Sequence, residues 1–241
     1  MRIITFLLFK ELKLIGVLQF PGSNCDLDVL KVLRDIVKTE ARPIWFKETD
    51  VSDLDGLIVP GGFSYGDHLR AGAISARMPV LEGVKELARA GKPVLGICNG
   101  FQILVESGLL PGALSPNITT KFICKWMNLR VENVSNAFTN LYKKGDVVRM
   151  PIAHAEGRFI CDSETMKKLR ENDQIAFLYV NEGGEATVDA NPNGSMGNIA
   201  GICNEEGNVL GLMPHPERAS KEILTSTDGK RMFEAMVNFI K

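Results

Sequence analysis

The chain has 241 residues, and its 28 Lys and Arg against 29 Asp and Glu give a formal net charge of −1. Hydrophobic residues make up 45% of it and charged residues 24%, as in ordinary globular proteins, which argues against long disordered stretches. Without a basic excess, nothing in the composition favours nucleic acid or an anionic membrane as a partner. The length predicts one or two domains at about 150 residues each.

The first twelve residues begin with a short apolar stretch. It is interrupted by Thr5, is followed at once by Lys10 and Glu11, and has no small-residue cleavage site. We therefore predict neither an export signal nor a membrane span.

The first half of the chain alternates strands with helices. Residues 13–20 form a continuous apolar run, which predicts a strand buried on both faces. Ser23 and Asp26 have the spacing of a capping box, which predicts a helix that continues to about Thr39. Further strands are predicted at 42–47, from 55 onward and at 92–98, and further helices at 79–90 and 99–108. This alternation predicts a parallel sheet.

The second half has a different pattern. Residues 120–161 are rich in β-formers around a KKGD turn, and a short helix is predicted at 162–171. Strand-like pieces follow near 176–180, 197–203 and 208–213, and an amphipathic helix covers 228–241. We predict a single domain over 13–241, in which a partly antiparallel extension continues a mostly parallel sheet.

The cysteines are five in number, at positions 25, 98, 124, 161 and 203. They form no C-x-x-C unit, and with three histidines no linear spacing of zinc ligands exists. Scattered cysteines of odd number predict reduced thiols in a cytosolic protein. Cysteines 25, 124, 161 and 203 are predicted to be core or half-buried thiols.

Cys98 has the strongest chemical context. It lies in G-I-C-N-G, between an apolar strand and a helix, which is the pattern of a nucleophile elbow with a thiol. Such a turn lifts the thiol out of the sheet, and the helix N-terminus favours the thiolate. The backbone N–H of Asn99 would then face an oxyanion beside the sulfur. The alternative is a small buried hydrophobic residue.

A candidate base follows a later strand, in M-P-H-P-E-R. His215 would take the thiol proton, and Glu217 would fix the tautomer of the imidazole. The alternative is an ordinary His–Glu pair in a surface turn. In open α/β sheets, sites form where strands end, and both Cys98 and His215 follow strands.

A glycine pair follows the third strand, in V-P-G-G-F-S-Y-G-D-H. Gly61 to Gly66 has the spacing of a phosphate loop, but Asp67 and His68 occupy the Lys and Ser/Thr positions, which excludes one. The N–H of Gly62 is instead a candidate oxyanion donor, and a plain tight turn is the alternative.

Longer motifs resemble a known family. The strings are FPGSNCD, VPGGFSYGDHLRAGAI, GICNGFQILVESGLLPGAL, NLRVEN, PIAHAEGRF, NPNGSMGNIAGI and MPHPERA. In this order, over residues 13–241, they resemble the glutaminase subunits (subunit I) of phosphoribosylformylglycinamidine (FGAM) synthase, which are class I glutamine amidotransferases of purine biosynthesis. Residues 1–12 precede the point where sequences of this family begin, and are a misassigned start, an engineered addition or an extra edge strand.

The resemblance implies a flavodoxin-like, doubly wound α/β fold and a cytoplasmic enzyme. Cys98 would be the nucleophile, His215 the acid and base, and Glu217 its partner. Gly62 and Asn99 would form the oxyanion hole, and Gln102 would help to hold glutamine. The chain would carry no metal or cofactor and would bind neither nucleic acid nor membrane.

The implied partners are two other subunits. Ammonia would pass to a large synthetase subunit that uses ATP and magnesium to convert formylglycinamide ribonucleotide to formylglycinamidine ribonucleotide, and a third small subunit would complete the complex.

Two alternatives remain open at this point. One is a glutaminase that serves another synthetase, such as the one of pyridoxal-phosphate synthesis. The other is a redox or chaperone-like protein that keeps the elbow cysteine but lacks the late His-x-Glu.

Overall fold

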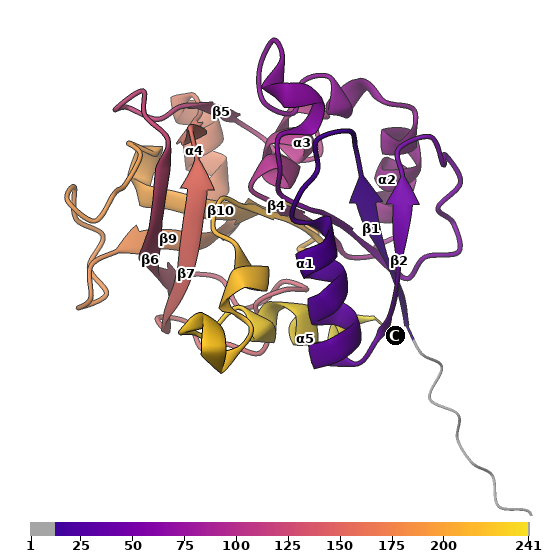
Figure 1. Ribbon diagram of the computed structural model, residues 1–241. Coiled ribbons are helices and arrows are strands. Elements are labelled where there is room, and N and C mark those ends of the chain that lie inside the picture. The colour runs from indigo at the N-terminus through magenta and orange to yellow at the C-terminus, as the bar shows by residue number, and fades with distance from the viewer. Residues whose placement is uncertain (1–12, 241) are drawn as a thin grey trace, which may run out of the picture.

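The computed structural model describes residues 13–240, and its main feature is one twisted nine-stranded sheet with the order β2-β1-β3-β4-β11-β10-β9-β6-β7 (Figure 1). A separate pair, β5 and β8, is antiparallel. The strands are β1 (Leu14–Gln19), β2 (Glu40–Trp45), β3 (Gly56–Val59), β4 (Val94–Ile97), β5 (Ala113–Pro116), β6 (Ile123–Val131), β7 (Val147–His154), β8 (Glu156–Ile160), β9 (Ile175–Val180), β10 (Ile199–Cys203) and β11 (Val209–Leu212). The helices are α1 (Asp26–Lys31), α2 (Val80–Arg89), α3 (Asn99–Glu106), α4 (Ser163–Glu171) and α5 (Lys230–Phe239).

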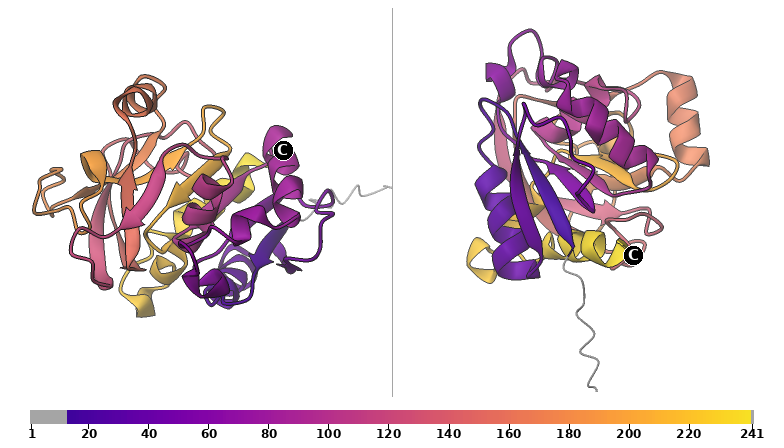
Figure 2. Two further views of the ribbon diagram at one scale, coloured as in Figure 1. Left: turned by 90° about the horizontal axis from the view of Figure 1, so that it is seen from above. Right: turned by 90° about the vertical axis from the view of Figure 1, so that its right-hand side faces the viewer.

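The first half of the sheet is parallel. Strands β2, β1, β3, β4 and β11 all pair in parallel. Helices α1 and α5 lie on one face of these strands, and α2 and α3 lie on the other (Figure 2). Every residue of β3, β4 and β11 is buried, as expected for strands covered on both faces. These strands form the core of the molecule.

The second half of the sheet is antiparallel. Strand β11 pairs antiparallel with β10, which continues through β9 and β6 to β7. Burial alternates along β7, as expected for a sheet with one covered face. This half curls back over the first, because the N–H of His215, just beyond β11, donates to the carbonyl of Pro151 in β7 at 2.8 Å. The edge strand β7 therefore lies above the carboxyl end of the central strands.

Local signals set most of the helix ends, and one prediction about them is wrong. Gly91 ends α2 with a φ of +76°, and the side chain of Asp162 caps α4 by accepting from the Thr165 N–H at 2.7 Å. Ser23 does not cap α1; its Oγ accepts from the Phe20 N–H at 3.0 Å and closes the turn after β1. After Lys31, the helix continues in π-helical turns over Val32–Val37.

The fold class is confirmed as α/β with a mostly parallel sheet and an antiparallel extension. Strands β1, β3, β4, β9, β10 and β11 lie where the apolar runs predicted them, while β2 begins two residues before the predicted 42–47. The predicted extension, 1–12, lies outside the described residues. Among residues 13–240, no helix is both long enough and apolar enough to cross a bilayer.

Candidate active site

Cys98 occupies a strained turn between β4 and α3. Its φ of +50° and ψ of −104° lie where a residue with a side chain is rarely found. The turn is tight enough that a Cβ on Gly100 would stand 1.9 Å from the Val59 carbonyl oxygen of β3. The two glycines of G-I-C-N-G are therefore required for close packing, since a Cβ on Gly96 would stand 2.8 Å from the Gly100 backbone. This geometry is that of a nucleophile elbow.

His215 and Glu217 follow β11, the parallel neighbour of β4. The His215 Nδ1 and Glu217 Oε1 atoms are 2.6 Å apart, and each residue is 2% exposed. Since a carboxylate only accepts, Nδ1 carries the proton of this bond and Nε2 is left to serve as the base. Nε2 is buried without a hydrogen-bond partner. Cys98 and Cys25 both affect the pKa of His215, so its ring lies close to both thiols. A histidine within reach of a thiol is the arrangement that nucleophile activation requires.

Gly61 lies next to three other residues of the candidate site. A Cβ there would lie 2.8 Å from His215 Cε1, 3.2 Å from Cys25 Sγ and 3.5 Å from Cys98 Cβ. The glycine therefore leaves room for the His215 imidazole, the Cys25 thiol and the Cβ of Cys98 to lie close together. The Cys98 thiol also faces the Ala153 carbonyl of β7, with the Sγ–O distance 3.7 Å. The loops that follow β1, β3, β4 and β11 and the curled-back edge strand β7 all contribute to this group.

The charge of His215 is set by its neighbours. Burial is the largest single influence and disfavours the imidazolium, but the Glu217 carboxylate, Cys98 and Cys25 together outweigh it. The pKa of His215 is therefore held well above its usual value. The site thus favours an imidazolium, the species that can protonate a leaving amine.

The two predicted oxyanion donors, Gly62 and Asn99, belong to the segments that follow β3 and β4. Gly62 has a φ of +149°, and a Cβ there would stand 2.8 Å from both Ser23 Cα and the Asn24 nitrogen, so only glycine fits. Asn99 is the first residue of α3, where backbone N–H groups have no partner within the helix. Its side chain is fixed by the Ser64 N–H, which donates to Oδ1 at 3.3 Å.

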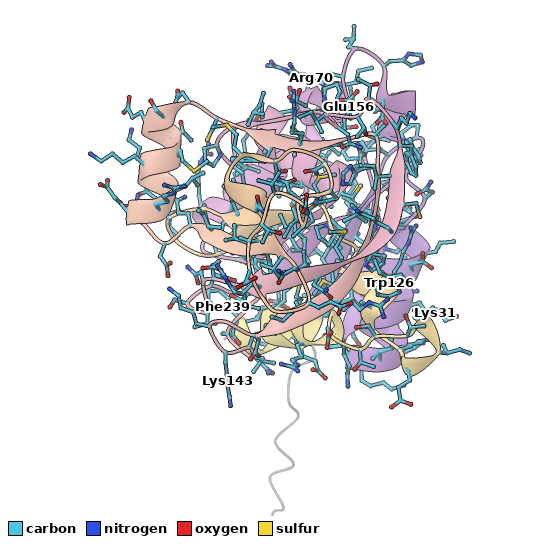
Figure 3. All side chains as sticks on the ribbon, turned by 90° about the vertical axis from the view of Figure 1, so that its left-hand side faces the viewer. Lys31, Arg70, Trp126, Lys143, Glu156 and Phe239 are labelled. Carbon is cyan, nitrogen blue, oxygen red and sulfur yellow. The ribbon has the colours of Figure 1, made fainter. Side chains whose placement is uncertain are left out.

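Gln102 lies one turn into α3, and its side chain is held by the protein. Its Oε1 accepts from Asn99 Nδ2 at 2.9 Å, and its Nε2 donates to the Glu156 carbonyl. Glu156 lies beside Arg70 at this end of the molecule, far from Lys143 and Phe239 (Figure 3). Contact of Gln102 with substrate glutamine stays a prediction. In this structure both polar atoms of its amide have partners within the protein.

Sequence analysis assigned no part in the chemistry to three buried polar side chains that lie near Cys98 or His215. Cys25 is buried as predicted, but its thiol lies beside His215 rather than among apolar residues alone. Tyr179 is fully buried, and burial together with the nearby Cys98 raises the pKa of its hydroxyl. Cys25 follows the turn after β1, so the rule that sites form at strand ends would have found it. Tyr179 lies within β9, and no linear signal marks it.

His154, at the end of β7, is the third of these side chains. Its Nδ1 lies 3.0 Å from Asn117 Oδ1, and burial and the charge of His215 lower its pKa to about 4. It is therefore a neutral, buried neighbour of the site.

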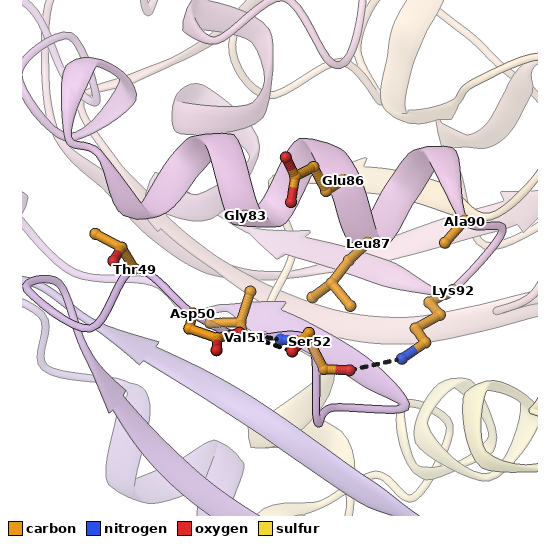
Figure 4. A pocket seen from close by; sticks show the side chains of 9 residues that line it. All are labelled: Thr49, Asp50, Val51, Ser52, Gly83, Glu86, Leu87, Ala90 and Lys92. Carbon is orange, nitrogen blue, oxygen red and sulfur yellow. Dashed lines mark hydrogen bonds between the residues drawn. The ribbon is translucent and has the colours of Figure 1, made fainter.

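A cavity of about 450 Å³ lies away from this group (Figure 4). It is bounded by the loop before β3 and by the end of α2, where Lys92 Nζ donates to the Ser52 carbonyl at 3.1 Å. It is thus at the amino ends of β3 and β4, whereas Cys98 is at the carboxyl end of β4. This cavity is not part of the candidate site.

Comparison with known proteins gives a consistent result. Residues 13–240 match the CobB/CobQ-like glutamine amidotransferase domain. Subunit PurQ of phosphoribosylformylglycinamidine synthase from Methanosarcina barkeri is 58% identical, over 94% of this chain and 97% of the relative, and PurQ from Aquifex aeolicus is 52% identical, over 91% and 96%.

Solved structures agree with this. A chain in the structure of PurLQS from Thermotoga maritima superposes with a TM-score of 0.84 at 42% identity, covering 95% of this chain and 100% of that one. The glutaminase domain of Trypanosoma brucei CTPS, solved with bound acivicin, shares the fold, with a TM-score of 0.59 at 13% identity over 94% of each chain. The family predicted from the motifs is confirmed: the chain belongs to the glutamine amidotransferases, as a member of the glutaminase subunits of phosphoribosylformylglycinamidine synthase.

Proposed function

We propose that Cys98, His215 and Glu217 of this chain hydrolyse the side-chain amide of glutamine, and that Gly62 and Asn99 bind the oxyanion. The observation that carries the proposal is the elbow cysteine beside an unpartnered Nε2 of a buried, carboxylate-bound histidine. Membership of the family supports the reaction class, and the geometry supports the assignment of residues.

The first half-reaction forms a thioester. The Cys98 thiolate attacks the amide carbon, and the negative charge moves to the amide oxygen, which the N–H groups of Gly62 and Asn99 would bind. The C–N bond then breaks, and the His215 imidazolium gives its Nε2 proton to the departing nitrogen, releasing ammonia. Glu217 keeps the positive charge favourable until that transfer.

The second half-reaction restores the thiolate. Neutral His215 takes a proton from water, the hydroxide attacks the thioester, and the C–S bond breaks to give glutamate. The sum is glutamine plus water to glutamate plus ammonia. Both halves use the same histidine, first as an acid and then as a base.

The proposal gives the chain two partners. The large synthetase subunit binds ATP, magnesium and formylglycinamide ribonucleotide and uses the ammonia, and a third small subunit completes the complex. A division of labour of this kind agrees with the absence of any phosphate-loop or dinucleotide motif from the sequence. The five unpaired cysteines suit a reducing compartment, so we place the complex in the cytoplasm.

The site is closed in this structure. Cys98 is only 5% exposed and lies beneath β7. Glutamine therefore requires a movement of the covering segments before it reaches the thiol. Such closure fits a glutaminase that releases little ammonia until its synthetase is engaged, because free ammonia would be wasted.

The test is release of ammonia from glutamine by the purified chain, first alone and then with the synthetase and third subunits, ATP, magnesium and formylglycinamide ribonucleotide. We expect stimulation by the partners, and loss of all release in Cys98→Ala. The same assay with Cys161→Ala, a thiol outside the site, is the matched control. Ammonia release that the partners do not stimulate would contradict coupling to the synthetase. Ammonia release that persists in Cys98→Ala would contradict the assignment of Cys98 as the nucleophile.

A further inference from the structure

The Cys25 thiol lies beside the proposed acid–base pair, His215 and Glu217, and glutamine hydrolysis gives it no part. Polar atoms of these three side chains all lie within 4.8 Å of one another, and all three residues are buried. A Cβ on Gly61 would stand 3.2 Å from Cys25 Sγ and 2.8 Å from His215 Cε1, so the sulfur and the imidazole lie on either side of this glycine's open position. A sulfur in this place can influence the base without touching the substrate.

Hydrogen bonds on both sides fix the thiol of Cys25. It donates to Asn24 Oδ1 at 3.2 Å, and its sulfur accepts from Arg218 Nη2, also at 3.2 Å. The backbone N–H of Cys25 donates to the Gly61 carbonyl at 3.2 Å, which holds the main chain at this point. The sulfur is therefore a fixed acceptor for the guanidinium group of Arg218.

Arg218 is placed to compete with His215 for the Glu217 carboxylate. Its Nε lies 3.9 Å from Glu217 Oε1, beyond hydrogen-bond length, whereas His215 Nδ1 lies 2.6 Å from the same oxygen. The other carboxylate oxygen, Glu217 Oε2, is buried and has no hydrogen-bond partner. Because a guanidinium binds a carboxylate through two parallel hydrogen bonds, an Arg218 released from Cys25 would move onto Glu217. It would then neutralise the charge that favours the imidazolium.

We propose that Cys25 is a positioning residue of the acid–base pair: its sulfur holds the Arg218 guanidinium, so that the Glu217 carboxylate serves His215 alone. This role rests on the proposed function, in which His215 protonates the departing ammonia and Glu217 maintains its charge. Cys25 forms no covalent bond in the reaction and acts only through Arg218 and Glu217.

The charged and titratable groups around the pair are consistent with this role. Those that face His215 or its carboxylate partner come from several elements: Cys25 after β1, Asp28 of α1, Cys98 after β4, His154 of β7, and Glu217 and Arg218 after β11. Burial is the largest influence and lowers the pKa of His215, while Glu217, Cys98 and Cys25 raise it. Loss of the Cys25 sulfur removes one favourable neighbour and frees one competing cation. Both changes lower the pKa of His215.

The test is an NMR titration of His215 in the purified chain, which contains three histidines. Their Cε1–H signals are assigned with His68→Gln and His154→Gln. In Cys25→Ala the pKa of His215 should fall, whereas Cys25→Ser, whose hydroxyl also donates and accepts, should keep it near the wild-type value. Cys203→Ala, which removes a buried thiol of β10, is the matched control and should not change it.

A second substitution separates this role from a merely structural one. When Cys25→Ala is combined with Arg218→Met, no guanidinium remains to take Glu217, so most of the fall in the pKa of His215 should be reversed. Arg218→Met alone should leave that pKa unchanged or raise it, and this variant tests the proposal even if Cys25→Ala does not fold.

Three results would overturn the proposal: no fall in Cys25→Ala, the same pKa of His215 in Cys25→Ala and in the double variant, or a fall in Arg218→Met. All of these titrations are made without glutamine. Their outcome is therefore separate from that of the proposed function, which fails only if ammonia release does not depend on Cys98.

Activity of the complex should follow the charge of His215. Cys25→Ala should lower kcat for ammonia release by about tenfold and leave KM for glutamine within about twofold, because the sulfur acts on the acid and not on the bound substrate. The alkaline limb of the kcat profile should shift to lower pH, and adding Arg218→Met should restore most of the rate. A higher KM with an unchanged kcat would contradict the proposal, because it would mean that Cys25 binds glutamine.

Discussion

The two halves of the sheet contribute differently to the site. The parallel half supplies the proposed nucleophile, Cys98, after β4 and the glycine pair after β3, and both strands are buried throughout. The antiparallel half supplies cover, through the carbonyls of Pro151 and Ala153 on its edge strand. Strand β11 belongs to both, because it pairs parallel with β4 and antiparallel with β10, and His215 follows it. His215, the proposed acid and base, thus lies at the boundary between the two halves and contacts residues of both.

We therefore place the proposed chemistry in the parallel half and at β11, where the two halves meet. Variants that remove reacting groups there should abolish turnover and leave the fold intact. Variants that disturb packing there should cost more stability than equivalent changes in the antiparallel half. Replacing a polar group that the antiparallel half buries near the site, such as His154, should mainly change how stability depends on pH.

The largest expected effect is that of Cys98→Ala. Removing the sulfur removes the covalent route, so kcat for ammonia release should fall by about 10⁵-fold or more. Thermal unfolding should move little, because the methyl group of alanine remains in the turn. A loss of folded protein instead of activity would make Cys98 a structural core residue.

Glu217→Gln should have a smaller effect on the same reaction. The amide keeps the shape but loses the charge that raises the pKa of His215, so kcat should fall by about 10³-fold. With that pKa lowered, the imidazolium is lost at lower pH, and the alkaline limb of the kcat profile should shift to lower pH. An unshifted profile, or a loss as large as that in Cys98→Ala, would mean that Glu217 does more than orient and charge the imidazole.

Gly100→Ala tests packing at the elbow. The new Cβ would stand 1.9 Å from the Val59 carbonyl oxygen, which is backbone and cannot rotate away. We expect a loss of about 3 kcal/mol, which lowers Tm by about 10 °C for a chain of this size.

The matched control is Gly183→Ala, on the loop after β9 in the antiparallel half. Its Cβ would stand 3.3 Å from a single side-chain oxygen, that of Asn181. The change in stability should stay within about 0.5 kcal/mol. Equal losses in the two variants would contradict the distinction between the halves.

The effect of His154→Gln on stability should be confined to acidic pH. Burial lowers the pKa of His154 from 6.5 to about 4, so the unfolded chain binds this proton more readily between those values. Stability therefore falls as pH falls through that window, by about 3 kcal/mol from this residue. The variant should lose this part of the slope in urea unfolding measured from pH 7 to pH 4.

Asp67 also contributes to the pH dependence of stability, but it contributes equally in wild type and in His154→Gln. Burial and Glu156 raise its pKa to about 6, so its ionisation costs stability as pH rises above the ordinary value of 3.8. That slope has the opposite sign and is present in both proteins, so it cancels between wild type and His154→Gln. Identical slopes in the two proteins would show that His154 is not held neutral.

Prediction from sequence worked best where a local pattern decides the structure. Apolar runs located the parallel strands, and the glycines around Cys98 indicated the turn, because both depend on neighbours in the chain. The capping box at Ser23 failed because its hydroxyl found a closer partner, the Phe20 N–H, in the turn itself. Local patterns identify candidate hydrogen bonds, and the folded structure determines which of them form.

The contact between Cys25 and His215 could not be predicted in this way. The two residues are brought together by the parallel pairing of β1, β3, β4 and β11, which places their strand ends at one edge. The position of β7 over Cys98 could not be predicted either, because it depends on the curvature of the antiparallel strands. Such contacts follow from the path of the sheet and leave no mark in linear spacing.

The carbonyls of Pro151 and Ala153 have a consequence for how this protein can change over time. Because they are backbone atoms, no exchange of one amino acid for another deletes them, and the outward-facing positions of β7 can change in sequence while Cys98 and His215 keep these contacts. A slip of one residue in the β6–β7 pairing would turn the inward-facing positions outward and move both carbonyls. The site is therefore tolerant of substitution along this hairpin and vulnerable to a single inserted or deleted residue there.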